Sequence, residues 1–297
     1  MSDFVQQQNS ICDFATSDSW VILSPIEQSI KKKIEAVGTP LKDWDINIYR
    51  GVLTGCNEAF IIDSEKRDEI LANCQTEDER QRTAELIRPI LRGRDIKRYG
   101  YVDNGLYLIN THNGVRGRIP RIKIEDYPAV KAHLDQYWDR IATRADKGDT
   151  PYNLRNCAYL EDFSRPKIIW KRIGSILRFS FDNKGCLGLD STCFATGEHI
   201  EYLCCILNSL MGHYLLKDSP KTGTGDLLVS VQAIEPACIP YNSQYERQLS
   251  TLLNRQINNP YDSSEKEIND IVFTMYDLSP KEREYVTQYI KLSQQSL

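Results

Sequence analysis

The stretch that decides the fold runs from residue 168 to residue 216 and reads IIWKRIGSILRFSFDNKGCLGLDSTCFATGEHIEYLCCILNSLMGHYLL. Its two apolar runs, 168–170 and 177–181, predict short strands. The sequence DNKG at 182–185 is typical of a hairpin turn between the second strand and the next one. Residues 198–216 predict one helix, and its many apolar positions indicate burial on most sides.

Helices and strands are expected on both sides of this stretch. Ser24 suits a helix N-cap, Pro25 suits the first turn, and Gly38 suits the end of that helix. The expected helices are 24–37, 64–88, 127–144, 198–216 and two stretches after Gln244 separated by Asn259-Pro260. The expected strands are 46–52, 59–62, 106–109, 168–170, 177–181 and 227–231. This order predicts an α+β fold, with a mixed, curved β-sheet, a helical support and a helical C-terminal tail.

The basic residues are clustered, although the formal net charge is −4. The segment 88–98, RPILRGRDIKR, has five basic residues and one acidic residue. A second group is Arg116, Arg118, Arg121 and Lys123, and a third is Arg165, Lys167, Lys171, Arg172 and Arg178. Because phosphate binding depends on local charge more than on the sum, these clusters favour a nucleic-acid partner, with solvated surface charge as the alternative.

The remaining composition indicates a protein of the cytoplasm. The nine cysteines are odd in number and contain no CxxC pair, so we expect reduced, structural thiols and no metal site. No apolar run is long enough for a transmembrane helix. The N-terminus, MSDFVQQQNS, has no basic start or apolar core and does not resemble a secretory signal.

Several fragments resemble catalytic motifs but are incomplete. Asn259-Pro260-Tyr261 is one proline short of an amino-methyltransferase signature, and no Gly-rich cofactor loop precedes it. Asp182-Asn183-Lys184 fits half of a metal-dependent nuclease motif, but it lies in an expected turn, and turn chemistry explains it. The Gly-Thr loop KTGTGD at 221–226 is not a Walker loop, although it can lie near a phosphate. We therefore predict no catalytic and no metal-binding residues.

Five segments together resemble a known family. They are LKDWDINIYRGVLTGCNEAFIID (41–63), IRPILRGRDIKRYGY (87–101), LYLINTHNG (106–114), DKGDTPYNLRNCAYLEDFSRPKIIW (146–170) and EINDIVFTMYDLSPKE (267–282). In order and spacing they resemble the C-terminal target-recognition region of type IIG restriction-modification enzymes, the specificity domain shared with Taq-type adenine-N6 DNA methyltransferases. The resemblance covers roughly residues 20–290.

The resemblance implies that recognition and catalysis belong to different regions of a longer polypeptide. Members carry a nuclease, a central adenine methyltransferase and this recognition region, so S-adenosylmethionine and Mg²⁺ are expected in the parent protein and no cofactor in this chain. The expected partners are double-stranded DNA and the methyltransferase domain of the same polypeptide. We expect residues 1–44 to be a linker and N-terminal helix, 45–243 the recognition domain, and 244–297 a helical segment that supports it.

The resemblance also gives the basic segments a role in recognition. In such enzymes the recognition domain and the methyltransferase enclose the duplex while the target adenine is flipped out. Phosphate contacts set the register, and a few side chains read base edges. Gly93 is expected to permit a close backbone approach. The predicted DNA-binding residues are Arg50, Thr54, Asn57, Arg92, Arg94, Lys97, Arg98, Lys171, Arg172, Lys221, Thr222 and Thr224.

Two alternative functions remain open at this point. The first alternative is the specificity region of a methyltransferase from a phage-exclusion system that has no nuclease. The chain can also be a protein-interaction scaffold without DNA binding, which would tolerate charge reversal in the 92–98 segment. An exposed apolar seam on the helical support is expected if a partner domain docks there.

Overall fold

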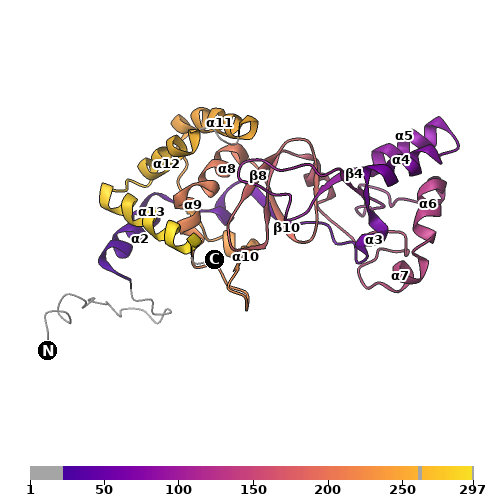
Figure 1. Cartoon of the computed structure of the whole chain (residues 1–297), viewed down its shortest axis with the longest axis horizontal. Coiled ribbons are helices and arrows are strands. Elements are labelled where there is room, and N and C mark those ends of the chain that lie inside the picture. Colours follow the sequence, from indigo (N-terminus) through magenta and orange to yellow (C-terminus); the bar gives the residue numbers. More distant parts are fainter. Residues whose placement is uncertain (1–22, 260–262, 296–297) are drawn as a thin grey trace.

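The computed structural model describes residues 23–259 and 263–295 as three parts arranged along one long axis (Figure 1). Helices gather at one end, strands occupy the middle, and a smaller group of helices and strands forms the other end. The helices are α2 (Pro25–Val37), α3 (Asn57–Phe60), α4 (Ser64–Ala72), α5 (Glu77–Leu86), α6 (Pro128–Asp135), α7 (Trp138–Thr143), α8 (Ile200–Asn208), α9 (Leu210–Leu215), α10 (Val231–Ile234), α11 (Ser243–Asn258), α12 (Ser264–Met275) and α13 (Pro280–Gln295).

The strands form two four-stranded sheets and two short pairs. They are β1 (Thr39–Pro40), β2 (Ile46–Arg50), β3 (Ile61–Asp63), β4 (Ile87–Leu91), β5 (Leu106–Ile109), β6 (Lys167–Lys171), β7 (Ile173–Gly174), β8 (Phe179–Asp182), β9 (Leu187–Gly188), β10 (Thr192–Gly197), β11 (Leu227–Leu228) and β12 (Cys238–Ile239). The α+β class is confirmed, with the strands divided between sheets.

The central sheet has the order β2-β10-β6-β8 and is antiparallel throughout. Successive side chains of a strand point to opposite faces. Ile168 and Trp170 therefore pack in the core on the helical side, whereas Ile169 packs in the core on the other side. Covering both faces explains why the three central residues of β6, 168–170, are all apolar.

The helical support consists of α2, α8, α9 and α11–α13. Its core includes Ile30, Leu253, Val272 and Val286. The predicted single helix 198–216 is wrong, because the chain breaks at Ser209 and begins α9 there. The Ser209 side chain accepts a hydrogen bond from the backbone N–H of Gly212, which caps the new helix.

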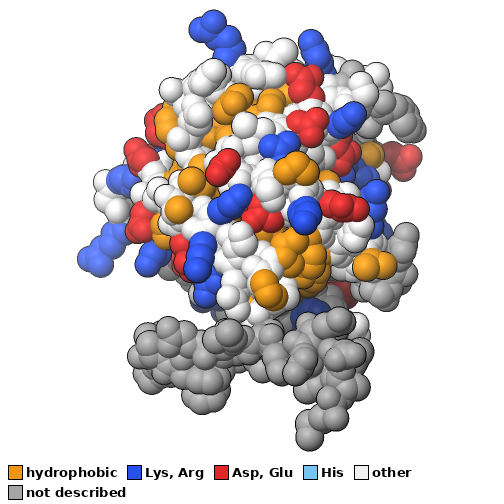
Figure 2. Space-filling view, turned by 90° about the vertical axis from the view of Figure 1, so that its left-hand side faces the viewer, with side chains coloured by type: hydrophobic (Ala, Val, Ile, Leu, Met, Phe, Trp, Pro, Cys, Tyr) orange, Lys and Arg blue, Asp and Glu red, His pale blue; other side chains and the backbone are white. Residues whose placement is uncertain are grey.

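The outer surface of the support carries mixed charges. Figure 2 views this end of the molecule and shows lysines and arginines interspersed with aspartates and glutamates. Hydrophobic side chains lie between them in separate patches rather than in one seam. Leu292 on α13 is the most exposed large hydrophobic residue among those described, at 66%.

The second four-stranded sheet has the order β3-β5-β4-β9 and lies with α3–α7 at the other end (Figure 1). It is mixed, since β4 pairs with β5 antiparallel and with β9 parallel. Phe60, Leu108, Val130 and Leu134 are fully buried in its core. Phe194 of β10 belongs to the same core, so the central sheet separates two hydrophobic cores.

Several predicted elements differ from the structure. Residues 64–88 form α4, α5 and the start of β4, and residues 127–144 form α6 and α7. The run 59–62 is the end of α3 followed by β3. The turn at 182–185 does not make a hairpin, because β8 pairs with β6 and β9 pairs with β4. The tail contains α11, α12 and α13, one helix more than predicted, and Pro260 lies outside the described residues.

The start of helix α2 agrees with its prediction, whereas the predicted segment boundaries are not tested. The predicted N-cap Ser24 is confirmed, and together with Glu27 it forms a capping box at the start of α2. The boundaries after residues 44 and 243 stay a prediction, but they do not separate cores, because Ile30, Ile168 and Leu249 share one. Within the described residues, no helix combines the length and apolar character needed to cross a membrane.

Candidate nucleic-acid interface

One end of the central sheet brings several predicted residues together. Strand β2 ends at Arg50, β6 ends at Lys171, and β10 begins at Thr192 beside both, because Lys171 pairs with Thr192 and Arg50 pairs with Cys193. The loops that leave these strands, together with the 92–95 turn and the Gly-Thr loop 221–226, form what we call the loop end of the sheet.

Hydrogen bonds tie these loops to one another. The backbone N–H of Gly93 donates to the Ser191 hydroxyl at 3.4 Å, and the N–H of Arg172 donates to the Ser191 carbonyl at 2.9 Å. Strand β7, which follows Arg172, pairs with β11. Since Lys221 bridges to Leu227 of β11, the Gly-Thr loop is attached to the same end.

The 92–95 turn is organised by a buried carboxylate. Asp95 is 2% exposed and accepts hydrogen bonds from the backbone N–H, Nε and Nη2 of Arg92 at 2.7, 3.1 and 3.1 Å. Burial acts to raise the pKa of Asp95, but the hydrogen bonds and charge of Arg92 outweigh it and lower the pKa. Arg92 is therefore engaged within the turn, whereas Arg94 is exposed at its tip.

Gly93 permits a close approach, but the neighbour that the structure shows is a side chain of the protein. A Cβ at Gly93 would lie 2.8 Å from Cγ of Lys171. The glycine thus lets the turn lie against Lys171, which is exposed. The amine of Lys97 donates to the Arg94 carbonyl at 3.2 Å, so Lys97 also lies at this turn.

Most of these cations have no acidic partner. The exceptions are Arg92, which pairs with Asp95, and Arg50, whose Nη2 atom lies 3.5 Å from the Asp190 carboxylate. Arg172 is half-buried, and its buried Nε atom has no hydrogen-bond partner within the described residues. Among the described residues, no carboxylate lies within 4.0 Å of the side-chain nitrogens of Arg94, Lys97, Lys171, Arg172, Arg178 and Lys221. This gives the loop end an excess of uncompensated positive charge.

The Gly-Thr loop is a compact turn at the surface. The N–H of Thr222 donates to the Asp226 carbonyl at 2.8 Å, and the N–H of Gly225 donates to the Thr222 carbonyl at 2.9 Å. The hydroxyls of Thr222 and Thr224 lie 2.8 Å apart. Lys221 and Thr224 are exposed and Thr222 is half-buried, so the loop can present polar groups to a ligand.

Two predicted contact residues must be corrected. Thr54 is 2% exposed, and its hydroxyl donates to Asn57 Oδ1 at 2.5 Å, so it supports the 51–57 loop and does not reach the surface. Asn57 itself is exposed at the start of α3. Arg98 points toward the helical support, where its guanidinium pairs with Glu265 and donates to the Asn208 carbonyl. Arg98 therefore joins the segment that lies beside β8 to helix α12.

The structure adds a residue that sequence reasoning missed. Arg144 is 7% exposed and has no carboxylate partner among the described residues. Its guanidinium donates to the carbonyls of Thr54, Asp146, Pro151 and Asn153. Burial lowers its pKa to about 10. Arg144 therefore fastens the 51–57 loop to the 146–153 loop, and no sequence pattern marks an isolated arginine for this task.

The nuclease-like fragment has a structural explanation. Asp182 ends β8, is 1% exposed and forms an ion pair with the fully buried Lys167. Its carboxylate also accepts hydrogen bonds from the Tyr101 hydroxyl at 3.0 Å and from the backbone N–H of Cys186 at 2.9 Å. Its oxygens are thus occupied within the protein. The described residues contain no group of three or more His, Cys, Asp or Glu side chains suited to a metal.

Comparisons with known proteins agree on the kind of domain. Residues 88–240 match the family described as the TaqI-like C-terminal specificity domain. No curated protein matches the chain. Among solved structures, the chain is similar to the type IIL restriction-modification enzyme MmeI, determined in complex with DNA, with a TM-score of 0.60 and 10% identity. It is also similar to the type IIG restriction endonuclease BpuSI, with a TM-score of 0.53 and 14% identity.

The two alignments cover most of this chain but only a minor part of each enzyme chain. The alignments cover 88% and 92% of this chain but only 36% and 33% of the MmeI and BpuSI chains. This chain therefore spans about a third of the length of either enzyme. At these identities the similarity shows the fold, which is shared with one region of each enzyme.

Proposed function

This chain belongs to the family of TaqI-like C-terminal specificity domains, and we propose from that membership that it recognises a specific sequence in double-stranded DNA. The observation that carries the proposal is the loop end of the central sheet. Loops distant in the sequence meet there and present Arg94, Lys97, Lys171, Arg172 and Lys221 with no carboxylate within 4.0 Å among the described residues. Uncompensated cations are what phosphate binding requires.

The geometry favours different roles for two of these cations. Arg94 lies at the tip of a turn that the Asp95–Arg92 interaction holds in place. A positioned arginine suits a guanine edge, where it can donate two hydrogen bonds. Lys171 lies behind the turn at a strand end, which suits a phosphate contact that sets the register. Arg50, Asn57, Thr222 and Thr224 complete the proposed contact set.

The parent polypeptide is proposed to be an adenine-specific DNA methyltransferase that is also a type II restriction endonuclease of the cytoplasm. S-adenosylmethionine and Mg²⁺ would act in its catalytic domains, and the methyltransferase domain would close the DNA cleft opposite the loop end. A methyltransferase of a phage-exclusion system without a nuclease is the second candidate. The MmeI and BpuSI similarities favour the restriction enzyme, because both are restriction enzymes by name.

The decisive experiment is selection of binding sites from random duplexes with the purified chain. We expect a recovered sequence motif, and an affinity that falls steeply between about 50 and 200 mM salt. Arg94→Ala should relax the motif at one position and cost about 1–3 kcal/mol there. Lys171→Ala should weaken all duplexes alike and lower the salt slope by about 1.

A matched control lies on the helical support. Arg247 on α11 is exposed and, among the described residues, has no ion-pair partner, so Arg247→Ala should leave both the motif and the salt slope unchanged. If the isolated chain does not bind, the selection is repeated with the full-length parent. Absence of a motif in both proteins would contradict DNA recognition and favour the interaction scaffold.

A further inference from the structure

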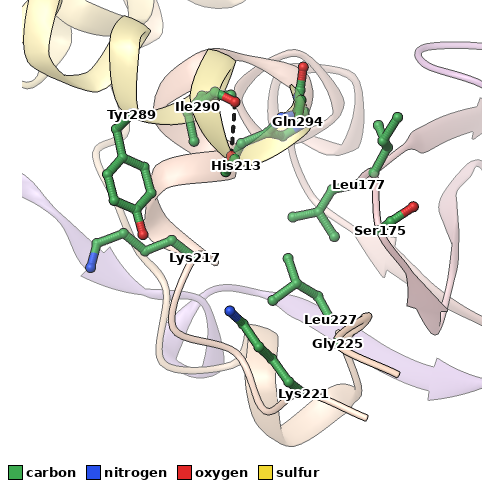
Figure 3. Close-up of a pocket in the computed structure, with 12 residues that line it drawn as sticks. Ser175, Leu177, His213, Lys217, Lys221, Gly225, Leu227, Tyr289, Ile290 and Gln294 are labelled. Carbon is green, nitrogen blue, oxygen red and sulfur yellow. Dashed lines mark hydrogen bonds between the residues drawn. The ribbon is translucent and has the colours of Figure 1, made fainter. Parts of the chain in front are cut away.

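A cavity of about 170 Å³ lies between the Gly-Thr loop and the helical support. Its walls come from four parts of the chain: residues 175–177, α9 with the residues after it, the segment 221–227, and α13 (Figure 3). Because it touches both the loop end and the support, a ligand there would contact elements with separate roles in the fold.

The charged side chains that line the cavity are positive. Lys217 and Lys221 line the cavity, and no aspartate or glutamate does. The amine of Lys217 lies 2.6 Å from the Asp218 carboxylate, so its charge is compensated. Lys221 has no carboxylate within 4.0 Å among the described residues, and Figure 3 shows its amine directed toward the cavity. The entrance therefore offers one uncompensated cation to an anionic group.

The loop that carries Lys221 offers further hydrogen-bond donors. In the described chain, the backbone N–H groups of Gly223 and Thr224 have no acceptor. A Cβ atom added at Gly223 or Gly225 would have no described atom within 4 Å, so the surface at these residues is open. Consecutive free amides beside a lysine are a common arrangement for holding a phosphate.

The lining of the cavity is partly apolar and partly polar. Leu177 and Leu227 face the space from two sides (Figure 3). His213 lines it, is 6% exposed, and has an Nε2 atom without a hydrogen-bond partner in the part of the chain that the structure describes. Burial and the charge of Arg98 lower the pKa of His213 to about 3, so the imidazole is neutral and provides one donor and one acceptor. A flat ring with a polar edge matches this lining.

We propose that the cavity binds the phosphate-bearing unit of a nucleotide, with Lys221 at the phosphate, Leu177 and Leu227 against the ring, and His213 at its polar edge. The unit can be a free nucleotide or a nucleotide of the bound DNA, which offer the same chemistry. The bound nucleotide would contact both the Gly-Thr loop and the support, since Lys221, Gly225 and His213 all line the cavity.

The test is an NMR titration of the whole chain with labelled leucine and isoleucine methyl groups. Thymidine 5′-monophosphate should shift the methyl resonances of Leu177, Leu227 and Ile290, whereas thymidine and inorganic phosphate should bind more weakly than the nucleotide. Lys221→Met should weaken nucleotide binding at least about tenfold, because it removes a charged hydrogen-bond donor. Lys123→Met, an exposed lysine of the 116–123 group, should leave it unchanged.

A second variant tests the location of the site. Ser175 is exposed and lines the cavity, so Ser175→Trp should fill the entrance and abolish the methyl shifts while the chain stays folded. Absence of nucleotide-dependent shifts in the unmodified chain, or equal weakening by Lys221→Met and Lys123→Met, would overturn the proposal.

The source of the nucleotide is resolved by competition. Once the mononucleotide is shown to bind, duplex DNA is added to the same sample. Displacement of the mononucleotide assigns the site to a nucleotide of the DNA. Simultaneous binding of both assigns it to a free nucleotide. Failure of DNA recognition by the chain would leave the mononucleotide titration unaffected, so the two proposals fail separately.

Discussion

Arg144 is a buried cation neutralised by dipoles rather than by an opposite charge. Four backbone carbonyls accept hydrogen bonds from its guanidinium, and its Cζ atom lies 4.3 Å from the centre of the Phe60 ring. Each of these carbonyls would lose a partner if the guanidinium were removed, and a buried carbonyl without a partner is costly. The residue thus joins the loops at 51–57 and 146–153.

We predict that Arg144→Met lowers the free energy of unfolding by roughly 2–4 kcal/mol. Urea denaturation followed by circular dichroism measures the change. Arg116→Met replaces an exposed arginine of the smaller end and should change stability by less than about 0.5 kcal/mol. Equal effects of the two substitutions would mean that the carbonyl contacts of Arg144 contribute nothing specific.

The Lys167–Asp182 ion pair predicts different losses of stability for a single and a double variant. Both residues are buried, and burial lowers the pKa of Lys167 while the charge of Asp182 opposes that shift. Lys167→Met leaves a buried carboxylate without its cation and should cost about 3–5 kcal/mol. The double variant Lys167→Met/Asp182→Asn removes both charges and should recover much of that loss in the same denaturation assay. A double variant as unstable as the single one would contradict this account.

Helices α2 and α13 are joined through one carboxylate at the start of α13. Glu282 accepts hydrogen bonds from the Lys33 amine at 2.8 Å, the Ser29 hydroxyl at 2.6 Å and the Ser279 N–H at 2.7 Å. Burial acts to raise the pKa of Glu282, but these donors outweigh it and lower the pKa from 4.5 to about 2. The ionised form is therefore the one that holds the two helices together.

This lowered pKa predicts loss of stability in acid. The contribution of Glu282 is fully present above the ordinary pKa of 4.5 and is lost as the pH falls toward about 2. Urea unfolding at about pH 3 and pH 6 should show a smaller drop for Glu282→Gln than for the unmodified chain, from a lower starting stability. Glu284→Gln, on the exposed side of α13, should keep the full drop.

The whole molecule is organised around a sheet with a core on each face. Ile168 contributes to one core and its neighbour Ile169 to the other. The core on the helical side draws Ile30 from the first 44 residues and Leu249, Val272 and Val286 from the last 54. The middle of the chain cannot bury that face of its own sheet.

We therefore predict that a fragment of residues 45–243 does not fold cooperatively. Removing α2 and α11–α13 would expose the helical face of β6, β8 and α8, whose burial stabilises the sheet. Thermal melting by circular dichroism should show no sharp transition for the fragment, whereas residues 23–297 should melt cooperatively. A well-dispersed NMR spectrum of the fragment would contradict this prediction and favour an independent recognition domain.

Features that depend on neighbouring residues were determined by the sequence itself. The N-cap of α2 depends on Ser24 and on Pro25 directly after it, so the local sequence was enough to predict it. The β2 and β6 strands and the Gly-Thr loop were predictable for the same reason. The order of the five family segments was also visible in the sequence. The clusters of arginine and lysine were also visible before the fold was known.

Tertiary structure alone decided which of those cations can meet a ligand. Arg94 and Arg98 are equally basic in the sequence, but Arg98 is neutralised by Glu265 of a distant helix and Arg94 is exposed. Thr54 and Arg144 are buried through contacts with one another's loops. The physical reason is that charge neutralisation and burial depend on groups far apart in the chain, which come together only when the sheet and its two cores form.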